Sequence, residues 1–284
     1  MRVAEIVAKS IITESKLPDA DYVINPYVGC AFGCAYCYAS FMGRLVDEPI
    51  AAWGDYVYVK TNAVELADRE LAKMPAHKRQ GSILLSSVTD PYQGVETKYR
   101  LTRGILEKLD EHRYPGLVGI LTKSPMVIRD LDILGQIPQV EVGMTVTTTD
   151  DKVSRWLEMR APIASRRIRT LAEVNAAGID TYAFIGPLLP HFAEQPQLLD
   201  TLFAEIAGAG VRQVYVEHMN LKRYIRTRLQ PVLDSEPDQV RTAYVEARSE
   251  RHREKLDAIV APLLEKHGLR LRLSRVLYHN DKGS

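Results

Sequence analysis

The chain has 284 residues, of which 46% are hydrophobic and 26% charged, and this is the composition of a globular protein with a substantial core. Its formal net charge of +1 argues against a protein that holds nucleic acid mainly through its overall field, but leaves room for a local basic patch. No apolar run approaches the roughly 20 residues that cross a bilayer, and the N-terminal segment lacks the features of a secretory signal. We therefore expect a cytoplasmic protein that makes no membrane contact.

Short apolar runs rich in β-branched residues alternate with helical patterns along the chain. The predicted strands, in chain order, are 22–28, 83–88, 117–121, 140–147, 181–185 and 211–217. The predicted helices between them are 63–73, 99–112, 127–134, 164–177 and 197–209, with a capped turn at 152–157 after Thr149 or Asp150. Such alternation is typical of parallel β–α units, and it fits an open sheet as well as a barrel. Beyond residue 238 we expect one long charged helix, 238–267, and then a strand over LRLRLSRV.

In both architectures the functional groups come from the C-terminal ends of the strands. This rule predicts one rim made of residues 30–37, 87–93, 122–124, 145–148, 186–190 and 217–221.

All three cysteines lie in the first of these segments, within NPYVGCAFGCAYCYASFM. An odd number of cysteines so closely spaced is a poor disulfide framework and points to a metal or redox site. Iron–sulfur clusters favour thiolate ligands and usually take four, so three would leave one iron open. Zinc is the alternative, with His191 or His218 as a fourth ligand, and buried structural cysteines are a second alternative.

The spacing in CAFGCAYC, with Tyr36 before the third cysteine, resembles the CxxxCxxC motif of radical S-adenosylmethionine (SAM) enzymes. The segments SSVTDPYQ, LTKSPMVIRDLDIL and TTTDDKVSRWLEMRAP extend the resemblance, from about Asn25 to Pro190, to the spore photoproduct lyase-like (DNA repair photolyase-like) branch. The resemblance implies that Cys30, Cys34 and Cys37 hold a [4Fe–4S] cluster whose open iron binds SAM. It also implies reductive cleavage of SAM to a 5′-deoxyadenosyl radical, which abstracts hydrogen from a substrate.

We accordingly predict an α/β fold, a partial (β/α)6 TIM-type barrel of parallel strands with a C-terminal helical extension. The predicted radical SAM core domain covers residues 1–220, with the cluster loop at 25–42. Residues 221–284 are predicted to be an extension packed on that core.

Polar residues at the strand ends are the candidate SAM ligands: Ser87, Thr89, Asp90, Lys123, Thr145 and Thr147. Lys123 could pair with the SAM carboxylate as a point charge. By resemblance, Lys123 and the two threonines match SAM-contacting strand ends, and Tyr36 lies near adenine. Structural alternatives exist, since a lysine can lie on the surface, threonine is a good strand former, and Asp-Pro can begin a turn. Glu158 and Arg167 could steady the methionine end of SAM or form a surface ion pair, which would be worth little.

Spore photoproduct lyase uses a fourth cysteine as a hydrogen-atom donor, and this chain has Ser87 near that position and no cysteine outside the loop. A serine O–H bond is too strong for that role. Tyr38, Tyr92 and Tyr99 are therefore the candidate catalytic residues, and by resemblance Tyr38 lies near the reacting centre.

For the substrate, a small molecule or a peptide is preferred over nucleic acid. The nucleic-acid alternative depends on the basic stretch 221–228, which interleaves Tyr224 with cations. A non-catalytic zinc module is a third alternative. As a radical SAM enzyme the protein would also need an external one-electron donor of the flavodoxin or ferredoxin type.

Overall fold

Residues 1–278 are described by a computed structural model, and they form two compact units. Unit 1 comprises Met1–Gly33, Ala39–Gly143 and Ala176–Asp180. Unit 2 comprises Cys34–Tyr38, Met144–Asn175 and the chain from Thr181 onward. The chain thus passes from one unit to the other inside the cysteine loop and again inside strand β8 (Val140–Thr145).

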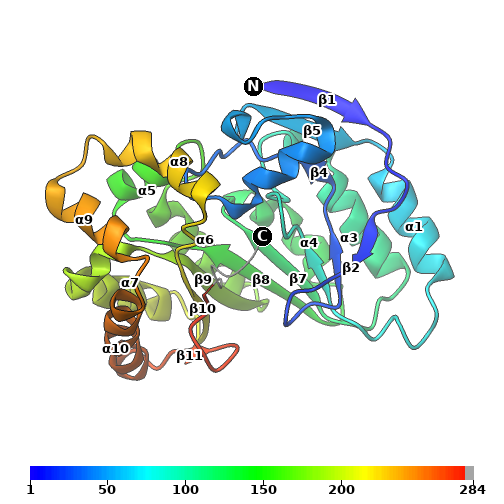
Figure 1. Cartoon of the computed structure of the whole chain (residues 1–284). Helices are drawn as coiled ribbons and strands as arrows, with labels where there is room; N and C mark the ends of the chain where they lie inside the picture. The colour runs from blue at the N-terminus through cyan, green and yellow to red at the C-terminus, as the bar shows by residue number, and fades with distance from the viewer. Residues whose placement is uncertain (279–284) are drawn as a thin grey trace. The chain divides into compact units, whose positions relative to one another are not determined.

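Unit 1 contains two sheets with helices (Figure 1). Its strands are β1 (Arg2–Ile6), β2 (Ile12–Glu14), β3 (Tyr22–Ile24), β4 (Tyr27–Val28), β5 (Tyr56–Lys60), β6 (Ile83–Leu85) and β7 (Val118–Thr122). Its α-helices are α1 (Ala63–Lys73), α2 (Glu96–Tyr99), α3 (Leu101–Glu111) and α4 (Leu131–Leu134), and its 3-10 helices are η1 (Tyr38–Val46), η2 (Ile50–Ala52) and η3 (Pro125–Asp130).

The larger sheet of unit 1 has the order β2-β3-β6-β7, followed by β8. The pairings of β3 with β6 and of β6 with β7 are parallel, whereas β2 pairs with β3 antiparallel. A smaller sheet has the order β1-β5-β4, with β1 parallel and β4 antiparallel to β5. Helices α1 and α3 lie side by side, and their apolar faces bury Leu66, Leu71, Ile105 and Leu109.

Unit 2 continues the β–α alternation from the end of β8. Its further elements are α5 (Asp151–Glu158), α6 (Ala164–Ala176), β9 (Asp180–Leu188), η4 (Pro190–Ala193), α7 (Pro196–Gly208), β10 (Gln213–His218), α8 (Arg223–Leu233), α9 (Asp238–Glu246), α10 (Glu250–Lys266) and β11 (Arg270–Leu271). The strand order is β8-β9-β10-β11, and β10 is parallel to both β9 and β11. The α/β fold class and the mostly parallel sheet are confirmed.

Several predicted elements differ from the observed ones at single residues. The predicted strand 22–28 is split into β3 and β4 at Pro26, which has no N–H to donate. The predicted helix 99–112 breaks at Arg100, where φ is 51° and the backbone is left-handed. By contrast, Asp150 caps α5 as predicted, since its carboxylate accepts from the Lys152 amide at 2.7 Å.

The C-terminal segment departs most from its prediction. The single helix expected over 238–267 is two helices, because Ser249 accepts a hydrogen bond from the His252 amide at 3.2 Å and starts α10 anew. The expected strand over 269–276 is reduced to β11, with one further bridge between Glu217 and Leu277. The predicted extension, 221–284, reaches six residues beyond the described part of the chain.

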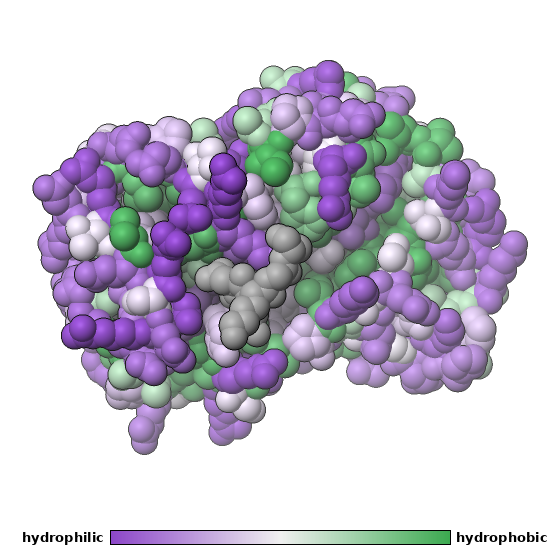
Figure 2. All heavy atoms as spheres, viewed as in Figure 1, coloured by the Kyte–Doolittle hydropathy of each residue, from purple (hydrophilic) through white to green (hydrophobic). Residues whose placement is uncertain are grey.

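The visible face carries mainly hydrophilic side chains (Figure 2). Within residues 1–278 no helix is both long enough and apolar enough to cross a membrane.

Candidate cofactor site

The chain on both sides of Cys30 is held by one buried side chain of unit 1, Gln93. Its amide oxygen accepts from the Ala31 N–H at 2.8 Å, and its amide nitrogen donates to the Gly29 carbonyl oxygen at 3.2 Å. Thr89 donates to the same carbonyl at 2.5 Å and also accepts from Gln93 at 2.9 Å. Gln93 is fully buried. These bonds fix the residues before and after the first cysteine, as a rigid ligand position requires.

Gly29 allows this turn because of its conformation and its lack of a side chain. Its φ is +91°, and a Cβ at this position would stand 2.5 Å from the Tyr56 carbonyl oxygen. Only glycine meets both conditions at low cost.

Replacing Gln93 by leucine should therefore loosen the Cys30 segment. The buried Ala31 N–H and Gly29 carbonyl would each lose a partner, which costs about 1–3 kcal/mol per group. We expect a lower urea midpoint and a lower iron content after reconstitution. Gln136, whose amide bonds an exposed carbonyl, is the matched control, and Gln136→Leu should change stability by less than about 0.5 kcal/mol. If the two variants lowered the urea midpoint and the iron content equally, Gln93 would have no special role in holding the Cys30 segment.

Asp90, a predicted SAM ligand, ties the end of β6 to the end of β7. Its Oδ1 accepts from the Thr122 hydroxyl at 2.7 Å and from the Tyr92 amide at 2.9 Å, and its Oδ2 accepts from the Lys123 amide at 2.8 Å. Burial raises the pKa of Asp90, while these hydrogen bonds act in the opposite direction. The carboxylate therefore has a structural task, and its contact with SAM stays a prediction. The Lys123 side chain, also a predicted ligand, is half-buried.

Two other predicted site residues of unit 1 contact the neighbouring chain. Ser87 accepts a long hydrogen bond, 3.4 Å, from the Asn25 side chain just before the cysteine loop. Tyr99 donates to the Glu5 carboxylate of β1 at 2.8 Å. Its role as a catalytic residue stays a prediction.

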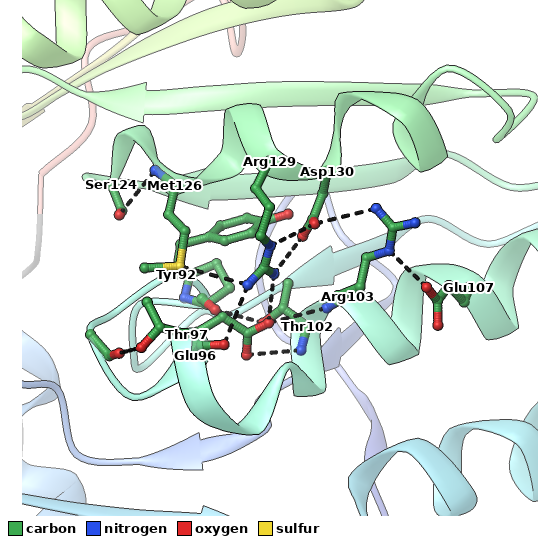
Figure 3. A network of polar contacts seen from close by, with 12 residues as sticks. Tyr92, Glu96, Thr97, Thr102, Arg103, Glu107, Ser124, Met126, Arg129 and Asp130 are labelled. Carbon is green, nitrogen blue, oxygen red and sulfur yellow. Dashed lines mark hydrogen bonds and ion pairs between the residues drawn. The ribbon is translucent and has the colours of Figure 1, made fainter.

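Tyr92 lies in a buried network of charged groups (Figure 3). The guanidinium of Arg129 forms two 2.8 Å bonds to Asp130 and one of 3.0 Å to Glu96, and it stands 5.9 Å from the centre of the Tyr92 ring. Burial, followed by the charge of Asp130, raises the pKa of Tyr92 well above its usual value. Glu96 also accepts from Tyr27, three residues before Cys30. The network thus supports the cysteine loop, and a catalytic role of Tyr92 stays a prediction.

In unit 2, Tyr36 is held by a buried ion pair. Its hydroxyl donates to Glu158, which pairs with Arg167 and accepts from Ser154 at 3.1 Å. Both members of the pair are fully buried, so the expectation of a surface ion pair is wrong. Arg167 also donates to the Thr145 carbonyl oxygen at 3.1 Å. Burial, reinforced by the Glu158 charge, raises the pKa of Tyr36 well above its usual value.

Helix α8 contacts the backbone of the same loop. Arg228 donates to the carbonyl oxygen of Cys34 at 3.2 Å, and Tyr224 donates to the carbonyl oxygen of Tyr38 at 3.0 Å. The Ala35 amide donates to the Leu157 carbonyl oxygen at 2.8 Å. Burial and then the Cys37 thiol raise the pKa of Tyr38. The segment that carries the second and third cysteines is thus braced by α5 and α8.

The chemical types of the side chains present suit a thiolate-bound cluster and a polar ligand such as SAM. The three cysteines are thiols rather than disulfide partners, and Cys30 and Cys34 are buried while Cys37 is half-buried. The hydroxyls of Thr147 in unit 2 and Ser86 in unit 1 are buried without a hydrogen-bond partner among residues 1–278. Buried hydroxyls are normally satisfied, so each is available to a bound molecule or water. Ser86 also has a φ of 68°, a strained conformation of the kind found at functional sites.

The two histidines considered as zinc ligands have other contacts in unit 2. His218 stands 2.8 Å from the Asp257 carboxylate, and His191 packs against Phe192 and Tyr244. Burial lowers the pKa of His191 to about 4. Within the described chain no three His, Cys, Asp or Glu side chains are gathered so that they could hold a metal ion. The three-cysteine ligand set therefore follows from the loop motif and the family, and stays a prediction.

Sequence reasoning did not single out Gln93, Ser86 or Arg228. Gln93 lies inside the predicted rim segment 87–93, but neither its burial nor the left-handed backbone of Ser86 has a signal in the local sequence. Arg228 was noticed only as part of a basic stretch, although its contact is with a backbone carbonyl of the loop.

The chain is similar to proteins of one family. The model of the Radical SAM superfamily matches residues 24–202. An uncharacterized protein of Methanocaldococcus jannaschii is 36% identical over 222 residues, which cover 78% of this chain and 79% of that protein.

Solved structures of spore photoproduct lyase show the same fold. The enzyme complexed with dinucleoside spore photoproduct has a TM-score of 0.71 and 15% identity, and the match covers 98% of this chain and 82% of that one. A variant with bound AdoMet and dinucleoside spore photoproduct has a TM-score of 0.66 and 16% identity, with 95% and 81% covered. The predicted resemblance is thus confirmed, and the chain belongs to the radical SAM superfamily, whose enzymes use a [4Fe–4S] cluster and SAM as cofactors.

Proposed function

We propose that Cys30, Cys34 and Cys37 ligate a [4Fe–4S] cluster at which this protein cleaves SAM reductively. When bound, the two cofactors supply a 5′-deoxyadenosyl radical that abstracts hydrogen from the substrate. The observation that carries the proposal is the way in which buried Gln93 and half-buried Arg228 fix the loop backbone. Gln93 bonds the residues on both sides of Cys30, and Arg228 bonds the carbonyl of Cys34. The buried amide of Gln93 is satisfied by these hydrogen bonds, which hold the loop backbone in one geometry, as a set of cluster ligands requires.

Other polar side chains are proposed to bind SAM. The hydroxyl of Thr147 can bond its ribose or its methionine end, since it is a donor and an acceptor. Lys123 can neutralise its carboxylate. Tyr36, whose hydroxyl donates to Glu158, is proposed to lie near the adenine of SAM. Thr145 is more limited, because its carbonyl accepts from Arg167.

For the substrate we propose a small molecule or a peptide. By resemblance, this chain has Ser87 near the position of the hydrogen-donating cysteine of spore photoproduct lyase, and Tyr38 is the proposed replacement among the tyrosines. The second candidate is a nucleic acid, favoured by the fold neighbour that was solved with a dinucleoside spore photoproduct. The proposed division into a core, 1–220, and an extension, 221–284, puts α8 in the extension.

Anaerobic reconstitution with iron and sulfide tests the proposal. The loaded protein should hold about four irons per chain, as the cluster type requires, and should convert SAM to 5′-deoxyadenosine and methionine when dithionite is added. Metabolite, peptide and oligonucleotide pools labelled with deuterium should then identify the substrate by label in 5′-deoxyadenosine. Protein that takes up zinc in place of iron, or that holds the cluster and leaves SAM intact, would refute the proposal.

A further inference from the structure

We propose that the N-terminal half of α8, with the cations Lys222 and Arg223, is the docking surface for an acidic one-electron donor protein of the flavodoxin type. The inference rests on the proposed function, because only a redox cluster needs such a donor. The proposed docking gives a role to the basic stretch 221–228, whose cations have no task in the proposed SAM site.

The inner side of α8 is attached to the cysteine loop. Tyr224 and Arg228 bond the carbonyl oxygens of Tyr38 and Cys34, and Ile225 and Leu229 are buried. The helix therefore contacts the peptide of one proposed cluster ligand and the residue after another. A protein bound on the outer side of α8 would be separated from these ligands by little more than the helix, whose diameter with side chains is about 10–12 Å.

The outer side of the same helix is positively charged. Arg223 is exposed, Lys222 is half-buried, and the sequence from Met219 to Leu233 contains no acidic residue. These cations are at the end of the helix where the macrodipole is also positive, so they weaken the isolated helix rather than stabilise it. A concentrated positive patch instead attracts a negatively charged partner and raises the rate of encounter.

A protein donor fits this surface better than a nucleic acid does. Single-stranded nucleic acids bind through aromatic faces on which bases stack, in addition to cations. Tyr224 is the aromatic residue of the stretch, but its hydroxyl is bonded to Tyr38 and its ring is half-buried. The surface thus has the positive charge of a nucleic-acid site but no aromatic face on which bases could stack. Positive charge alone is sufficient to attract an acidic protein.

Charge reversal at Arg223 tests the inference on the reconstituted full chain. We expect Arg223→Glu to lower SAM cleavage driven by reduced flavodoxin on the order of tenfold at low salt, with a weaker dependence on ionic strength. The affinity for oxidised flavodoxin, measured by titration without SAM, should fall in parallel. Cleavage driven by dithionite should be unchanged, because the small reductant needs no docking surface.

Arg251→Glu is the matched control, because Arg251 is an exposed arginine in the first turn of another helix, α10. Equal losses in the two variants, or no loss in Arg223→Glu, would overturn the inference. So would a loss of dithionite-driven cleavage in Arg223→Glu, or weaker binding of a labelled oligonucleotide with flavodoxin binding intact. A wild-type protein that does not cleave SAM with dithionite would instead refute the proposed function, and the inference would fall with it.

Discussion

Replacing any one of Cys30, Cys34 or Cys37 by alanine is expected to abolish reductive SAM cleavage. With two thiolates, one more iron would lose its protein ligand, and the open iron that binds SAM would no longer be unique. We expect iron and sulfide content after reconstitution to fall well below that of the wild type. Product formation should fall to the limit of detection, with SAM conversion measured by chromatography under dithionite.

The control for this prediction is the folding of the unreconstituted proteins. Cys37 is half-buried, so Cys37→Ala removes little buried surface, and its urea unfolding midpoint without iron should match that of the wild type. Ser40→Ala, in the same segment, is the second control and should retain iron and activity. A cysteine variant that keeps a full cluster and cleaves SAM would show that the ligand set is wrong.

The second large effect concerns the buried pair of Glu158 and Arg167. Glu158→Gln keeps the size of the side chain and removes its charge, which leaves the Arg167 guanidinium uncompensated in the interior. The loss of one partner of a buried ion pair costs about 3–5 kcal/mol. We expect that decrease in the free energy of unfolding, measured by urea denaturation of the iron-free protein. Tyr36 should also lose its fixed orientation, since its hydroxyl donates to Glu158.

Glu107→Gln provides the comparison, because Glu107 pairs with Arg103 at 2.7 Å on the surface of α3 and is 44% exposed. Its replacement should cost at most about 1 kcal/mol. The double replacement Glu158→Leu, Arg167→Met should lower the free energy of unfolding less than Glu158→Gln alone does, because neither member of the pair then leaves a buried charge. If Glu158→Gln lowered the free energy of unfolding no more than Glu107→Gln does, the buried pair would not stabilise the fold as its burial suggests.

The cofactor chemistry was readable from local sequence, because a cluster motif must supply its thiols from one short loop. The spacing of Cys30, Cys34 and Cys37 identified the family without any knowledge of distant contacts. The roles of individual polar residues were harder to predict from the sequence. Asp90 and Thr89 are at the predicted strand end, but their side chains bond backbone atoms, which a strand-end rule cannot foresee.

The α/β class and the positions of most strands and helices could be predicted from local patterns, because hydrophobic periodicity and caps such as Asp150 act over a few residues. The residues that hold the cysteine loop, in contrast, become apparent in the folded chain alone. Gln93 acts on Gly29 and Ala31 from 62 or more residues away, and Arg228 acts on Cys34 from 194 residues away. Burial likewise turned Glu158 and Arg167 from an expected surface pair into an internal one. Such contacts arise when distant segments pack together, and the local pattern around either partner contains no record of them.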